Sequence, residues 1–325
     1  MSLATSKAAG RVPLPLLSAA GALVLQITAA AAGPAIGQFE LKDLESEPGR
    51  VEFQSQNAHA FGQPHRRMDT RPGAGGETAY DDHSVVQQRH ALELEFSVTR
   101  YFRMRVGVEY EKERLDDPAS PALANDFGEL QLDEVALEGV VIVVPVPETG
   151  GVGFGMLAEF EAPVGGDDLN SIVFGPILEL RAGAWSAIAN LTLVKAFGNG
   201  GFDDDGTRER DRKLDLAYAI QVSHALDETW AVALEAYGTI DRLGHSGDAT
   251  DSARRFGDRD IHRAGPLIYY TRQLDRPAAT AGEAPTRSAA PAEDGTVLTI
   301  GTGVLVGLNQ HTPDATLKWS VEVEF

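Results

Sequence analysis

The chain has 325 residues, a formal net charge of −20 and no cysteine. Nucleic-acid binding calls for a basic patch, so such acidity argues against that class of partner. The lack of cysteine excludes a small secreted domain held together by disulfides. Hydrophobic residues make up 43% of the chain and alternate with polar ones, which predicts a folded chain rather than a disordered one.

The first 32 residues have the features of a secretory signal peptide. Lys7 and Arg11 supply a positive start, an apolar core runs over 14–25, and an alanine run offers small residues for cleavage. A membrane-spanning helix needs roughly 20 apolar residues, so this core is too short to be an anchor. We therefore predict export by a cleaved leader. The next stretch, 33–50, is polar without a clear period and is predicted to be a periplasmic lead-in.

Segments of strand length with alternating apolar and polar residues fill the remainder, 51–325. A period of two indicates β-strands with one apolar and one polar face. The clearest example closes the chain, where every second residue from Leu317 to Phe325 is large and apolar. The predicted strands cover 51–61, 92–98, 102–110, 128–144, 152–160, 172–181, 185–197, 214–222, 230–235, 262–272, 295–308 and 317–325.

These segments predict an all-β fold, a transmembrane antiparallel up-and-down β-barrel of about twelve strands. A slip in the alternation at Asp133-Glu134 predicts a β-bulge. An Ala/Pro/Glu-rich stretch over 273–294 predicts a flexible insert. Short and long connections mostly alternate, as periplasmic turns and outer loops do. The predicted short connections are 99–101, 145–149, 183–184 and 225–228.

A soluble β-sandwich or barrel would also show alternating strands. The leader, the terminal strand and the rhythm of the connections together favour a barrel in the outer membrane of a Gram-negative bacterium. Its partners would be outer-membrane lipid and the barrel assembly machinery. An aromatic C-terminus on such a strand resembles the signal that this machinery reads, so Trp319 and Phe325 are predicted to form an assembly signal.

In such a barrel the polar faces line the lumen. Buried charges must be paired or hydrated, so a charged lumen is either laced with ion pairs or wet. The residues predicted to line it are Glu93, Glu95, Arg103, Arg105, Glu109, Glu159, Glu161, Glu179, Arg181, Lys213, Asp215, Glu235, Lys318 and Glu322.

Two functions remain open for this lumen. A barrel of about eight strands is filled by side chains and one of about sixteen leaves a channel, so twelve is intermediate. One hypothesis is a passive channel or transporter for small molecules, biased toward cations by its glutamates. The other is a structural or surface-interaction barrel whose lumen is closed by a salt-bridged plug.

A barrel hydrolase is a third hypothesis. The stretch 244–248, Gly-His-Ser-Gly-Asp, departs from the Gly-x-Ser-x-Gly elbow of serine hydrolases, and it falls in a predicted outer loop. Neither His90 nor His224 has an obvious Ser partner, and the histidines match no common metal motif. We therefore predict no enzymatic activity, no catalytic residue, no metal and no cofactor, while Ser246 is the residue to test.

Three stretches carry a resemblance to a known family: Phe39–Gly49, Gly265–Tyr270 and Gly303–Trp319. They resemble a family of proteobacterial outer-membrane barrels akin to the transporter-like proteins of the MetA pathway of phenol degradation. The resemblance implies a barrel fold and uptake of hydrophobic or aromatic compounds, and it brings no catalytic residues. The 273–294 insert departs from the compact connection of that family.

Overall fold

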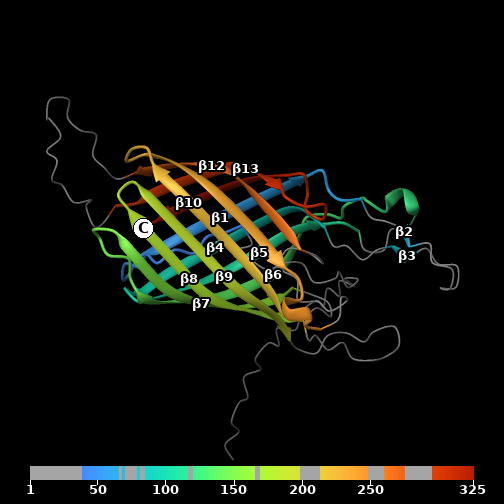
Figure 1. Ribbon diagram of the computed structural model, residues 1–325, viewed down its shortest axis with the longest axis horizontal. Helices are drawn as coiled ribbons and strands as arrows, with labels where there is room; N and C mark the ends of the chain where they lie inside the picture. Colours follow the sequence, from blue (N-terminus) through green and yellow to red (C-terminus); the bar gives the residue numbers. More distant parts are fainter. Residues whose placement is uncertain are drawn as a thin grey trace, which may run out of the picture.

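The described part of the chain forms a closed antiparallel barrel of twelve strands, seen here in a computed structural model (Figure 1). The structure describes residues 39–65, 68–69, 79–80, 85–115, 120–164, 169–197, 213–247, 260–274 and 295–325. The barrel strands are β1 (Val51–Phe61), β4 (Val86–Thr99), β5 (Phe102–Glu113), β6 (Gln131–Val144), β7 (Gly151–Pro163), β8 (Asn170–Ala182), β9 (Trp185–Phe197), β10 (Asp215–Ala225), β11 (Trp230–Ile240), β12 (Ile261–Gln273), β13 (Val297–Gly307) and β14 (Ala315–Glu324).

Each barrel strand pairs with its neighbours in sequence, and β1 pairs with both β4 and β14, which closes the ring. Closure satisfies the backbone groups of every strand without leaving an edge, as a bilayer requires. The all-β antiparallel up-and-down barrel predicted from the sequence is therefore confirmed. The predicted signal peptide and most of the 273–294 insert lie outside the described residues.

The two ends of the barrel differ in their connections. At the turn end, Arg100-Tyr101, 145–150, 183–184 and 226–229 join successive strands, and the 274–296 connection lies there too. The loop end carries the six other connections. One of them contains β2 (Met68–Asp69) and β3 (Ala79–Tyr80), a two-stranded sheet that projects beyond the barrel in Figure 1.

Short 3-10 turns at Pro121–Leu123 and Leu243–His245 are the helical elements of the described chain. No helix among the described residues is long and apolar enough to cross a membrane.

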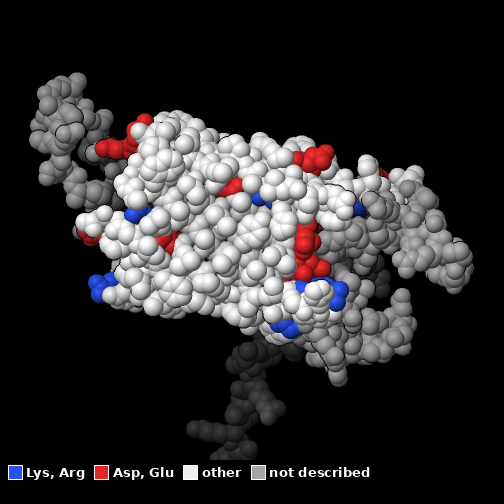
Figure 2. All heavy atoms as spheres, in the orientation of Figure 1, with Lys and Arg blue, Asp and Glu red and all other residues white. Residues whose placement is uncertain are grey.

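The burial pattern is the inverse of a soluble protein. Outward positions carry exposed apolar side chains, such as Val152 on β7 and Leu234 on β11, while the charged residues between them are buried inside. Most of the wall visible in Figure 2 is uncharged, and the acidic and basic groups lie mainly toward the two ends. An apolar outer wall around a charged interior suits a barrel surrounded by hydrocarbon.

The predicted β-bulge is present on β6. Glu109 of β5 pairs with Glu134, whereas the next residue, Tyr110, pairs with Leu132. Asp133 is therefore the extra residue, and it restores the inward and outward phases on either side of it.

Two strands carry a Gly-Pro pair at mid-length, Gly175-Pro176 on β8 and Gly265-Pro266 on β12. In each case the register with the next strand is kept, but the pairing skips these two positions. Proline has no N–H to donate to the ladder. A Cβ on Gly175 would lie 1.8 Å from the Leu191 carbonyl oxygen, so the close approach of β8 to β9 requires glycine there.

Candidate functional site

The residues before β1 lie inside the barrel. We call residues 39–50 the luminal segment, because their contacts are with inward-facing side chains. The segment runs from Arg50 at the turn end to Phe39, which packs against Tyr237 in the loop-end half of β11. This placement corrects the prediction that the stretch before β1 lies in the periplasm, as far as its described residues are concerned.

Side chains of the wall satisfy the backbone of the luminal segment. The Asn190 amide on β9 accepts a hydrogen bond from the Lys42 N–H at 2.7 Å and donates one to the Lys42 carbonyl at 2.8 Å. A Glu179 oxygen on β8 accepts the Leu44 N–H at 2.8 Å. The buried wall thus replaces the hydrogen bonds that the chain would otherwise make to water.

Arg103 of β5 binds the segment closer to Arg50, where the chain leaves the lumen at the turn end. Its guanidinium donates to the Asp43 carboxylate at 2.7 Å, to the Asp43 carbonyl at 2.7 Å and to the Glu45 carbonyl at 2.9 Å. A guanidinium group is planar and can donate to several acceptors at once, and its positive charge strengthens each of these hydrogen bonds. Arg103 therefore orders the backbone of the segment as well as pairing its charge.

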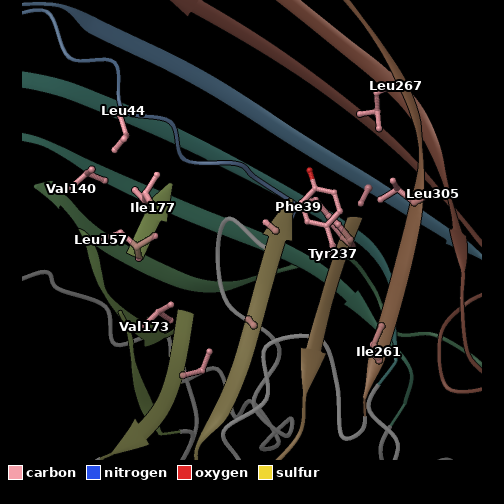
Figure 3. Close-up of a cluster of buried hydrophobic side chains, with 14 of the residues drawn as sticks. Phe39, Leu44, Val140, Leu157, Val173, Ile177, Tyr237, Ile261, Leu267 and Leu305 are labelled. Atoms are coloured by element: carbon pink, nitrogen blue, oxygen red, sulfur yellow. The ribbon is translucent and has the colours of Figure 1, made fainter. Parts of the chain in front are cut away.

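An apolar anchor sits beside these polar contacts. Leu44 is buried in a notch over the inward glycines of β7, where a Cβ on Gly153 would lie 2.7 Å from Leu44 Cδ1 and one on Gly155 2.6 Å from Leu44 Cδ2. Val140 and Ile177 lie beside it (Figure 3). The two glycines thus leave the space that the Leu44 side chain fills.

The charged side chains of Glu40 and Lys42 bind the segment to neighbouring strands of the wall. Glu40 pairs with Arg105 of β5 and with Lys42, whose ammonium also lies 2.9 Å from Glu138 of β6. Burial raises the pKa of the Glu40 carboxyl, but Arg105 and Lys42 outweigh it and lower that pKa to about 2. Glu40 therefore carries its charge at neutral pH and holds the segment to β5.

Phe39 reaches the opposite wall. Its ring meets the Tyr237 ring edge to face at a centroid distance of 5.6 Å, and the Arg263 guanidinium lies 4.8 Å from its centroid. Figure 3 shows Phe39 and Tyr237 together, apart from the Leu44 group. Arg263 is held in turn by Thr316 at 3.1 Å.

A polar network anchors that wall. The Lys318 ammonium lies 2.7 Å from the Glu235 carboxylate and 2.6 Å from the Tyr237 hydroxyl. Tyr269 donates to the same carboxylate, and Gln221 donates to it at 2.7 Å. The network satisfies a fully buried glutamate and holds the tyrosine against which Phe39 packs.

Beside the luminal segment lies a cavity of about 280 Å³, which we call the vestibule. It occupies the turn-end half of the lumen, between the segment and the wall of β10–β14 and β1. Its lining residues are Glu40, Leu41, Asp43, Glu52, Gln54, Gln56, Arg103, Arg105, Ile188, Gln221, Ser223, Ala231, Tyr269, Thr271, Thr299, Lys318, Ser320 and Glu322. Most of these offer hydroxyl, amide or charged groups.

The charged residues predicted to line the lumen are buried, except that Arg181 and Glu322 are half-buried. Arg105 brings Glu93 and Glu95 together at 3.1 and 2.7 Å. The other predicted residues are distributed along the lumen. Only Arg103, Arg105, Lys318 and Glu322 of the predicted set line the vestibule.

Sequence reasoning missed the luminal segment and its partners Asn190, Tyr237 and Arg263. One signal was available, because Phe39, Leu41 and Leu44 are large apolar residues in a stretch that is predicted to be a periplasmic lead-in. Such residues favour burial, and a lead-in in the periplasm offers none.

Ser246 gives no support to the hydrolase hypothesis. Its hydroxyl donates to the Leu214 carbonyl at 3.1 Å and accepts the Leu214 N–H at 2.9 Å. It therefore pins the connection after β11 to the start of β10. Within the described residues, no group of three or more His, Asp or Glu side chains is arranged to hold a metal ion.

No protein-family model matches the chain, and no curated protein matches its sequence. Among solved structures, the KdgM porin in complex with disordered oligogalacturonate has a TM-score of 0.39 and 5% identity over 85% of this chain and 98% of its own. The NanC porin has 0.41 and 10% over 84% and 98%. Pseudomonas aeruginosa OprD has 0.35 and 9% over 88% and 98%. Likenesses this low carry no argument about solute or mechanism.

Proposed function

We propose that this protein is an outer-membrane channel for small hydrophilic solutes, with the turn end facing the periplasm. The apolar outer wall and the predicted leader support a location in the outer membrane. The observation that supports transport is the vestibule, because a lumen serving stability alone has no need of a polar cavity beside its plug. Its volume, about 280 Å³, lies near the lower end for small-molecule sites, about 300 Å³.

The lining of the vestibule favours hydrophilic solutes over the hydrophobic or aromatic compounds that the family resemblance implies. Gln54, Gln221 and Thr271 present amide and hydroxyl groups, whereas the apolar contribution comes from a few residues such as Ile188. An apolar solute would strip water from these groups without replacing their hydrogen bonds, which costs free energy.

Liposome swelling tests the proposal. Vesicles containing the folded mature protein should admit glycerol and small sugars, with a rate that falls as solute size rises. Protein-free vesicles and vesicles containing heat-denatured protein are the controls. Equal swelling of all three, or uptake restricted to hydrophobic compounds, would contradict a hydrophilic channel.

The second candidate is the closed structural barrel, favoured by the packing of Phe39 against Tyr237 and Arg263. A barrel of this kind would keep the luminal segment permanently in place. Such a barrel would remain impermeable after the contacts of Phe39 are removed. This result would distinguish it from a channel.

A further inference from the structure

We propose that Phe39 is the residue that closes this channel, an inference that rests on the proposed transport function. Taking the strands in order around the barrel, β5 and β11 are six positions apart in a ring of twelve, so they face each other across the diameter. Neighbouring residues Glu40 and Phe39 contact these two strands, through Arg105 and Tyr237 respectively.

The luminal segment thus forms a bar across the whole lumen at this level. Nearer the turn end it does not, because the contacts of Lys42, Asp43 and Leu44 lie with β5–β9. There the vestibule separates the segment from β10–β14 and β1. A solute entering from the turn end has a polar space beside the segment until it reaches the bar.

The deep end of the vestibule adjoins this bar. Tyr269 and Lys318 line the vestibule and also bind Glu235, and Lys318 contacts Tyr237. The Tyr237 ring in turn packs against Phe39. The side chain next in line beyond the vestibule is therefore the Phe39 ring, the large apolar group of the bar.

The two halves of the bar are held differently. Glu40 is fixed by ion pairs to Arg105 and Lys42. Phe39 has ring contacts with Tyr237 and Arg263, each worth about 0.5–2 kcal/mol in general. The Phe39 side chain is thus held by packing rather than by charge, so removing it should leave the ion-paired half of the bar docked through Glu40, Leu44 and Arg103.

Single-channel conductance in planar bilayers tests the assignment with the full mature chain. Phe39→Ala should conduct several-fold more than the wild type. Leu234→Ala is the matched control: it removes a similar apolar mass from the outer face of β11, away from the lumen, so its conductance should equal that of the wild type. Heat-modifiable migration on gels checks that each barrel is folded.

The outcomes separate the two proposals. If wild type and Phe39→Ala pass the same measurable current, Phe39 is not the closing residue but the channel stands. If only the double variant Phe39→Ala/Leu44→Ala conducts more, the closure belongs to the docked segment as a whole, and the assignment to Phe39 is wrong. If no folded variant conducts, including the double variant, both the closure and the channel are overturned.

Discussion

Two inward glycines of β7 shape the wall for a single side chain. A Cβ on Gly153 would lie 2.7 Å from Leu44 Cδ1 and 2.6 Å from Val146 Cγ2. Overpacking of this kind costs about 1–3 kcal/mol, and the luminal segment can relieve it by moving whereas the barrel ladder cannot. The size of one residue on the wall therefore controls how the segment docks.

We expect Gly153→Ala to loosen the segment and raise the conductance, with little change in the thermal stability of the barrel. Gly139→Ala on β6 is the control, because a Cβ there would meet only the outward Phe102 ring, at 3.3 Å. Conductance and melting by circular dichroism measure the two effects. Identical conductance in both variants would show that Leu44 is not a docking anchor.

Glu52 and Glu322 line the vestibule and form no ion pair with any residue that the structure describes. The other acids of the lining are balanced, since Glu40 pairs with Arg105 and Asp43 with Arg103. Carboxyl groups without an ion pair in a narrow polar space favour cations over anions when they are ionised.

Replacing both, as Glu52→Gln/Glu322→Gln, should shift the reversal potential in a KCl gradient toward that of an unselective pore. If Phe39 closes the wild type, the measurement is made in the Phe39→Ala background. Glu47→Gln removes one carboxylate at the rim, where the side chain is 65% exposed, and should leave the potential unchanged. An unchanged potential in the double variant would count against selection by these residues.

At the scale of the element, the luminal segment has no secondary structure of its own and depends on the wall. The Asn190 amide, Glu179 and Arg103 supply its hydrogen bonds, and Leu44 and Phe39 supply its apolar contacts. Because these partners come from several strands, the docked arrangement requires those strands to be assembled.

Acid should release the segment in a defined range. The pKa of Glu40 is lowered from 4.5 to about 2, so its contribution to docking is complete above pH 4.5 and is lost as the pH falls through about 2. We expect conductance to rise over this range in the wild type. Glu40→Gln should lack this step. A wild-type rise that is complete by pH 4.5 would assign the effect to other groups.

At the scale of the whole molecule, the C-terminus closes the ring. The Phe325 N–H donates to the Val51 carbonyl at 2.8 Å, beside the β1–β14 ladder, and its ring is 62% exposed. Trp319, the other member of the predicted assembly signal, faces outward at the middle of β14 and is 40% exposed. The backbone and the ring of Phe325 therefore have separable roles.

Deleting Phe325 is expected to lower the amount of folded barrel in the outer membrane. Phe325→Ala keeps the backbone bond and should show the same defect if the ring is the signal, whereas Phe325→Tyr should assemble normally. Membrane fractionation with heat-modifiable migration measures the folded fraction. Normal assembly of the alanine variant would contradict a signal carried by the ring.

Alternation within single strands was enough to predict the twelve strands, their facing and the bulge at Asp133. Those features follow from a local period of two and from the need of a bilayer for apolar outer faces, so no long-range contact had to be known. For the same reason the inward set from Glu93 to Lys318 was identifiable, because alternation assigns each residue of a strand to one face.

What fills the lumen depends on long-range contacts that no local pattern encodes. The luminal segment has no period, and Phe39 meets Tyr237 through contacts nearly 200 positions apart in the chain. Its docking depends on the closed ring, which brings the strands of Arg105 and Tyr237 to opposite sides of the lumen. Alternation states which face a side chain occupies but not what lies across from it, and the function of a barrel depends on that space.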